Sequence, residues 1–239
     1  MLFTYLKQKA YEKKLRSVDI PDVFRHCFEQ VKNLDLKKSI KDVEFIVFDT
    51  EATGLRPKEG DVLLSIGAIG VSNGRVDLSK SFYELVKPER NIPHHSVVVH
   101  NLTPSKLKGL PPVSDVLARF FEFCKGDILV GHHTFFDIRF LDLALKENFG
   151  ITLANRVLDT AMIARCIQRI EDPGKVAMEE TRTVHLDGLA KRFNIKMPDR
   201  HDAYGDAFAT ALIFQRQISL LYKEGISLLK DLLRIGGVR

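Results

Sequence analysis

The sequence predicts an α/β fold in which a mixed sheet is flanked by helices and preceded by a helical N-terminal extension. Residues 44–88 hold three apolar runs, and Asn73-Gly74, a strong β-hairpin signal, joins the second run to the third. After residue 100, helical patterns alternate with the short apolar run "DILVGHH" at residues 127–133. Antiparallel strands followed by alternating helices and strands form a mixed sheet covered by helices.

The N-terminal extension, residues 1–43, is expected to form two helices divided by Pro21, because its apolar residues recur at helical spacing. The main domain is expected over residues 44–222, and a helical tail over residues 223–239. The extension contains no chemical motif, so we expect it to pack on the main domain or on a partner.

The elements of the main domain follow from local patterns. "EFIVFDTE" at residues 44–51 is predicted to be the first strand, and residues 62–88 the hairpin. Thr103 and Ser105 are predicted to cap a short helix. Longer helices are predicted at residues 113–124, 135–149, 158–169, 185–193 and 202–225, and a mobile loop at residues 171–183.

The formal net charge of +5 is concentrated in the extension, where ten Lys and Arg residues face six Asp and Glu residues (10 − 6 = +4). This excess favours a polyanionic partner only weakly, since a solvated helical surface explains it as well. No apolar run approaches the roughly 18 residues of a membrane span, so no membrane partner is expected. The cysteines at 27, 124 and 166 are odd in number and scattered, which indicates buried thiols in a reducing, cytoplasmic location.

Two carboxylates end the first predicted strand. Asp49 and Glu51 are two residues apart, so they point to the same face of the strand. Neighbouring carboxylates repel each other unless a cation lies between them, and oxygen ligands favour Mg²⁺ or Mn²⁺ over zinc. An exposed polar strand end is the alternative explanation for this pair alone.

Further acids stand in helical segments. Asp137 lies in the otherwise apolar stretch "TFFDIRFL", and Asp206 lies among small residues in "DAYGDAFATAL". Each acid also fits a position where a carboxylate is merely favoured by a helix N-terminus or by solvent. His201 precedes Asp206 by five residues, so if both serve one site His201 must stand on the loop before the helix.

The motifs resemble those of the DEDDh exonucleases, typified by the proofreading epsilon subunit of bacterial DNA polymerase III and by RNase T. The resemblance covers residues 44 to about 220 and leaves the extension outside. One departure is visible, because the family's usual His-Asn pair is His132-His133 here, which puts the usual Asn contact in doubt. The matching stretches are "FDTEATGL" with Asp49 and Glu51, "GHHTFFDIRFL" with Asp137, and "RHDAYGDA" with His201 and Asp206.

The resemblance implies an RNase H-like fold and a 3′-to-5′ exonuclease that hydrolyses phosphodiester bonds with two Mg²⁺ or Mn²⁺ ions. It implies that His201 is the general base, a task that suits the ordinary pKa of about 6.5 of an imidazole. The implied metal ligands are Asp49, Glu51, Asp137 and Asp206, and the implied substrate contacts are Thr53, Leu55 and His132.

Substrate and partners stay open at this level. The motifs serve DNA exonucleases of the proofreading or repair type and exoribonucleases alike, and single-stranded or frayed 3′ ends are expected in both cases. A non-catalytic binding module is the rival from another class, although such a module is expected to have lost an acid or the histidine. "QISLL" at residues 217–221 resembles peptides that bind the sliding clamp, but it also continues an apolar helix face. A polymerase subunit or a clamp is therefore a candidate partner.

Overall fold

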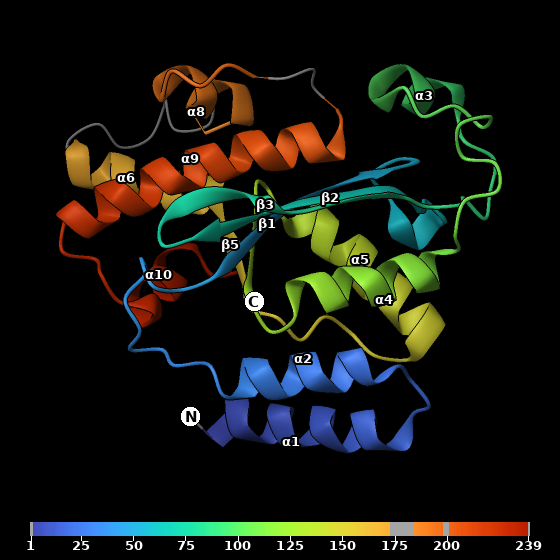
Figure 1. Cartoon of the computed structure of the whole chain (residues 1–239), viewed down its shortest axis with the longest axis horizontal. Helices are drawn as coiled ribbons and strands as arrows, with labels where there is room; N and C mark the ends of the chain where they lie inside the picture. Colours follow the sequence, from blue (N-terminus) through green and yellow to red (C-terminus); the bar gives the residue numbers. More distant parts are fainter. Residues whose placement is uncertain (1, 173–183, 198–200, 239) are drawn as a thin grey trace.

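The computed structural model describes residues 2–172, 184–197 and 201–238, and these form a mixed sheet flanked by helices (Figure 1). The predicted fold class is confirmed. The strands are β1 (Phe45–Ala52), β2 (Leu63–Ser72), β3 (Arg75–Leu85), β4 (Ile128–Gly131) and β5 (Val157–Asp159). The helices are α1 (Leu2–Ser17), α2 (Asp22–Lys32), α3 (His94–His100), α4 (Val113–Cys124), α5 (Phe135–Phe149), α6 (Thr160–Glu171), α8 (Leu186–Arg192), α9 (Ala203–Lys223) and α10 (Leu229–Gly236), with a 3-10 helix η1 (Pro57–Glu59).

The strand order is β3-β2-β1-β4-β5. β1 pairs antiparallel with β2 and parallel with β4, and β2 pairs antiparallel with β3. The predicted hairpin turn is present, with Asn73 at φ 53° and Gly74 at φ 68°, the left-handed conformation that this dipeptide favours. The central position of β1 means that its carboxyl end lies in the middle of one edge of the sheet.

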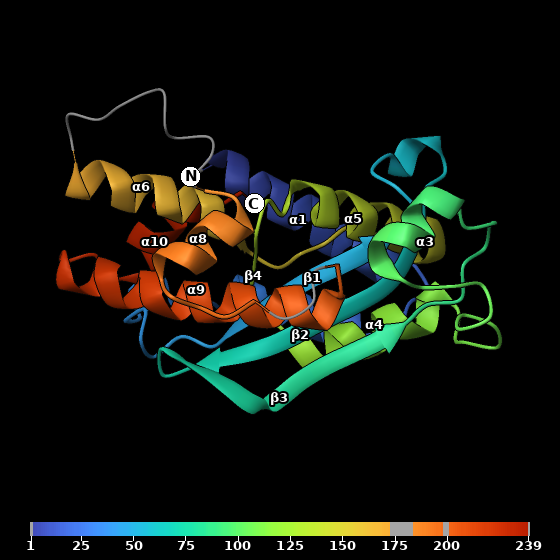
Figure 2. The ribbon, with the colours of Figure 1, turned by 90° about the horizontal axis from the view of Figure 1, so that it is seen from above.

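The two faces of the sheet are covered by different helices (Figures 1 and 2). Phe45 and Val47 belong to a core shared with α9 and α10, whereas Ile46 and Phe48 pack with α4 and α5. Burial on both faces explains why the first half of β1 is uninterruptedly apolar. Side chains after Phe48 continue this alternation, so they point to α9 and to α5 in turn.

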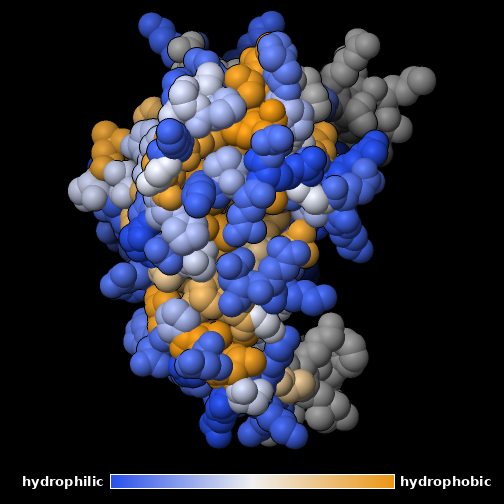
Figure 3. All heavy atoms as spheres, turned by 90° about the vertical axis from the view of Figure 1, so that its right-hand side faces the viewer, coloured by the Kyte–Doolittle hydropathy of each residue, from blue (hydrophilic) through white to orange (hydrophobic). Residues whose placement is uncertain are grey.

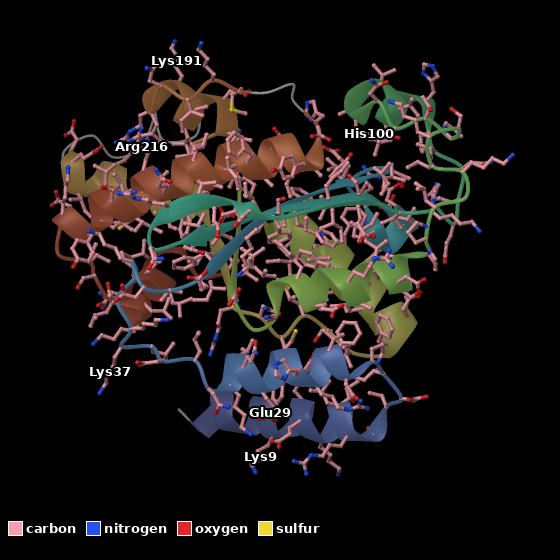
Figure 4. All side chains as sticks on the ribbon, in the orientation of Figure 1. Lys9, Glu29, Lys37, His100, Lys191 and Arg216 are labelled. Atoms are coloured by element: carbon pink, nitrogen blue, oxygen red, sulfur yellow. The ribbon has the colours of Figure 1, made fainter. Side chains whose placement is uncertain are left out.

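The predicted N-terminal extension packs against α4 and α5 as an outer layer, visible at the bottom of Figure 1. The ring of Phe24 lies 5.3 Å from the ring of Phe121 and 4.6 Å from that of Phe149. Gly126 permits close contact, because a Cβ there would lie 2.2 Å from the Cβ of Gln30. Charged side chains such as Lys9 project outward from this layer (Figure 4).

The segment after α2 is tied to the segment before α10 by backbone hydrogen bonds. Ile40 N donates to Ser227 O at 2.8 Å, and Leu229 N donates to Lys38 O at 3.0 Å. The predicted extension and the predicted tail therefore meet each other, although the division at residues 43 and 222 stays a prediction. Among the described residues, no helix combines the length and apolar character that crossing a membrane requires.

We predict that Phe24→Ala lowers the free energy of unfolding by about 3–5 kcal/mol, because it empties a buried aromatic site between α2, α4 and α5. Urea unfolding followed by circular dichroism measures the change. Leu36→Ala is the control, since the Leu36 side chain is 42% exposed. A loss below about 1 kcal/mol in Phe24→Ala would mean that the extension is not part of the cooperatively folded unit.

Several local predictions need correction. The helix predicted after Thr103 is a run of turns, and the helix of this region is α3, nine residues earlier at His94–His100. β5 occupies the beginning of the helix predicted from residue 158, and α6 starts only at Thr160. Cys27 and Cys124 are buried as predicted, but Cys166 is half-buried. The loop predicted at residues 171–183 falls almost entirely outside the described residues.

The segment "QISLL" is part of α9. Gln217 is buried and its Nε2 donates to Thr160 O at 2.8 Å, and Ile218 and Leu221 are buried in the core. A peptide that binds in extended form would first have to leave this helix. The structure therefore has the helix-packing alternative for this segment.

Candidate active site

The site lies at the carboxyl end of β1, where side chains alternate between the two faces of the sheet. Asp49 and Glu51 follow the parity of Phe45 and Val47 and point to the α9 side. Thr50 has the opposite parity and points to the α5 side. One strand end therefore offers two carboxylates to one helix and a hydroxyl to another.

Asp137 lies in the first turn of α5 and is 7% exposed. Its Oδ1 accepts hydrogen bonds from Thr50 N at 3.1 Å and from Thr50 Oγ1 at 2.6 Å. Burial raises the pKa of Asp137 to about 7, while the two bonds from Thr50 act in the opposite direction. The carboxylate is thus positioned by β1 but costs free energy to ionise when no cation is near.

Asp206 lies in the first turn of α9 and is 4% exposed. His201 stands on the loop before the helix, as its spacing predicts, with a left-handed φ of 65°. The backbone N–H of His201 donates to Asp206 Oδ2 at 3.1 Å. Helices from opposite faces of the sheet thus bring their first turns to the same strand end.

The ligand atoms of Glu51, His201 and Asp206 all lie within 4.8 Å of one another. Carboxylates at this separation repel, and a divalent cation with hard oxygen ligands removes the repulsion. Asp49 stands on the same strand face, and Asp137 approaches from the other side of β1. The donor set therefore fits divalent ions, and the assignment of individual ligands stays a prediction.

A cleft of about 790 Å³ opens beside these acids. Its lining includes Glu51, Asp137 and His201, and on its apolar side Leu55 and Phe136, which are 66% and 41% exposed. The end of the molecule that carries α3 and η1 shows apolar patches among polar surface (Figure 3). Large apolar side chains beside buried acids suit a ligand that has both flat apolar and anionic parts.

The predicted substrate contacts differ in exposure. Leu55 is exposed in the cleft, whereas Thr53 is completely buried. The Thr53 hydroxyl donates to Asp61 Oδ1 at 3.0 Å and accepts from Val62 N at 3.0 Å, so it stabilises the turn after β1. His132 is absent from the cleft lining, and its Nδ1 lies 2.8 Å from Thr160 Oγ1. Substrate contact by these three residues stays a prediction.

His133, the departure from the family pattern, has a φ of 55° on the loop between β4 and α5. Its ring lies 4.5 Å from the ring of His132 and 5.7 Å from that of His185. Its Nε2 is buried without a hydrogen-bond partner among the described residues. Burial lowers the pKa of the imidazole, and the charge of Asp159 opposes that shift. The ring is therefore packed in its neutral form beside other histidines.

We predict that His133→Asn makes the protein less sensitive to acid. The folded pKa lies below the unfolded value of about 6.5, so the unfolded chain binds the proton more strongly and stability is lost as pH falls below that value. The drop in melting temperature between about pH 7.5 and about pH 5.5 should shrink in His133→Asn and stay unchanged in the control His94→Asn, an exposed residue of α3. An equal drop in both variants would contradict this account.

Sequence reasoning missed several residues that organise the site. Asp159 caps α6 through Ala161 N at 2.8 Å and also accepts from Thr134 N at 3.1 Å, so it anchors the loop before α5. Thr50 holds Asp137, and the signal for it was its position between the two strand acids. His100 lies at the end of α3 and lines the cleft (Figure 4). Its proximity to β1 has no signal in the sequence.

Comparisons with known proteins agree with this geometry. A family model described as RNase T, exonuclease, matches residues 46–214. The DNA polymerase III subunit epsilon-like protein of Rhodobacter capsulatus is 36% identical over 188 residues, which cover 77% of this chain and 25% of that protein. The chain thus spans about a quarter of the length of that curated relative.

Solved structures share the fold. Exonuclease X, in complex with 5′ overhanging duplex DNA, aligns with a TM-score of 0.58 and 20% identity over 80% of this chain and 99% of its own. The nuclease domain of 3′hExo, described as a DEDDh family member bound to rAMP, aligns with a TM-score of 0.60 and 15% identity over 77% of this chain and 94% of its own. Fold, motifs and family match agree: the chain belongs to the exonuclease family, in its DEDDh branch.

Proposed function

We propose that this protein is a 3′-to-5′ exonuclease that hydrolyses phosphodiester bonds at single-stranded or frayed DNA ends. The observation that carries the proposal is the convergence of Glu51, His201 and Asp206 within 4.8 Å, beside a cleft that Asp137 also lines. A polyanionic substrate needs a counter-charge next to these acids, and two divalent ions, Mg²⁺ or Mn²⁺, would supply it and lower the pKa of a bound water.

The chain's own residues would divide the remaining work. Asp49, Glu51, Asp137 and Asp206 would hold the ions, and their buried positions leave little freedom to move away from that role. His201 would accept the proton of the attacking water, since its imidazole is exposed at the edge of the acid cluster. Leu55 and Phe136 would contact the terminal base through the apolar wall of the cleft.

DNA is the proposed substrate because a relative bears the name of a DNA polymerase III epsilon-like protein. A role in proofreading or repair, with a DNA polymerase as partner, follows from the same likeness. RNA differs by a 2′-hydroxyl that the acids and the apolar wall do not distinguish, so an exoribonuclease is the alternative that a direct test must decide.

The test compares linear and circular single-stranded DNA of the same sequence, with Mg²⁺ or Mn²⁺. We expect linear DNA to be degraded to mononucleotides from its 3′ end and the circle to be spared. Single strands should be degraded faster than blunt duplexes, because a paired end must be unstacked at a cost of a few kcal/mol. Labels at either end report the direction, and matched RNA decides between the two substrates. Efficient cleavage of the circle would contradict the proposal.

A further inference from the structure

Three residues form a row across the sheet beside the active site. Asp49 pairs with Gly67, and Gly67 pairs with Tyr83, so the row crosses β1, β2 and β3. Paired residues share a face of the sheet, and for this row it is the face covered by α9. The middle position has no side chain, so a gap separates Asp49 from Tyr83.

The N-terminus of α9 fills this gap. A Cβ on Gly67 would lie 2.3 Å from the carbonyl carbon of Ala203 and 2.3 Å from the N of Tyr204, so only glycine permits the contact. The first turn of α9 therefore rests on the backbone of β2 (Figure 2). Asp49 flanks that turn on one side and Tyr83 flanks it on the other.

Tyr83 contacts the two residues next to this close approach. Its hydroxyl donates a hydrogen bond to the carboxylate of Asp202, and its ring lies 6.4 Å from the ring of Tyr204 in an edge-on arrangement. Burial raises the pKa of Tyr83 to about 12, and the nearby charges of Asp202 and Glu51 raise it further. The phenol is therefore a neutral donor throughout the pH range in which the protein would work.

Asp202 links Tyr83 to the histidine. Its Oδ2 accepts from Gly205 N at 2.9 Å and so caps α9, while the preceding residue is His201. The φ of 65° at His201 is uncommon for a residue with a side chain, so neighbouring contacts must maintain it. Two such contacts are present: His201 N bonds to Asp206, and Asp202 is held by Tyr83 and the cap.

We propose that Tyr83 is a positioning residue that acts through Asp202 to hold the His201 loop in place. The effect is to keep the imidazole within 4.8 Å of the carboxylates of Glu51 and Asp206. This inference rests on the proposed function, in which His201 is the general base. Tyr83 does not belong to the residues that line the cleft, so its role is on the catalytic step and not on substrate binding.

The first experiment uses Tyr83→Phe, which keeps the ring against Tyr204 and removes only the hydroxyl. We expect kcat to fall about 10- to 100-fold, as for other residues that orient a catalytic group, with KM and oligonucleotide affinity unchanged. Tyr222→Phe is the matched control, because Tyr222 is 39% exposed and its ring contacts Lys41. A rise in KM with unchanged kcat, or an equal loss in both variants, would overturn the proposal.

The second experiment measures Tyr83→Phe in a His201→Ala background under single-turnover conditions. If Tyr83 acts through His201, the second substitution should cause no further loss. Independent losses that multiply would show that Tyr83 acts elsewhere, and would overturn the proposal while leaving the proposed function intact. If His201→Ala alone keeps full activity, the general-base role fails and the inference fails with it.

Discussion

Asp49→Ala is expected to abolish nuclease activity and to leave the fold intact. Asp49 is one of the carboxylates at the end of β1 and stands on the face where Glu51, His201 and Asp206 converge. Its loss should reduce activity by more than the about 10- to 100-fold that is typical when an outer partner of a metal ligand is removed. The metal-free fold should lose little stability, because fewer carboxylates then repel each other.

Activity is measured on 3′-labelled single-stranded DNA, and ion binding by calorimetry with Mn²⁺. Glu122→Ala, an exposed acid of α4, is the control and should match the unaltered protein in both measurements. The unaltered protein should lose activity in chelator and regain it when Mg²⁺ or Mn²⁺ is added. Full activity of Asp49→Ala, or full activity in excess chelator, would contradict the two-ion account.

His201→Ala is expected to lower the turnover rate by about 10²- to 10⁴-fold, the usual effect of removing a general base. Oligonucleotide affinity should remain, because the apolar wall of the cleft at Leu55 and Phe136 is unaltered. Ion affinity should change little, since the proposed ligands are carboxylates. The comparison of single-turnover rates with equilibrium binding separates these effects.

His94→Ala is the matched control, because this histidine is exposed on α3 and is absent from the cleft lining. It should keep the turnover rate of the unaltered protein. Near-full turnover of His201→Ala, in the same metal and at the same pH, would remove the general base from the mechanism. It would also place the protein outside the catalytic scheme that the DEDDh motifs imply.

The active-site acids could be predicted because each stands in a local pattern that contradicts its surroundings. Asp49 and Glu51 end an apolar strand, and Asp137 interrupts an apolar helix. The placement of His201 before the helix also follows from local geometry, because five residues turn a helix by about 140°. These conclusions need only the period of a strand or a helix, which the sequence contains.

Contacts between distant segments could not be predicted in the same way. Thr50 meets Asp137 across 87 residues, and Gln217 meets Thr160 across 57. The helix expected after Thr103 and the one found at His94–His100 illustrate the same limit, because short helices depend on what they pack against more than on their own propensity.

The sequence by itself determined the fold class, the hairpin at Asn73-Gly74 and the order of the catalytic motifs, since all of these follow from periodicity and from residue type at neighbouring positions. The tertiary structure decided that the extension covers α4 and α5, that His133 packs beside His185, and that Tyr83 reaches Asp202. Gly67 shows the physical reason. A glycine in an apolar strand has many explanations, and only the approach of α9 to within contact of its backbone selects one of them.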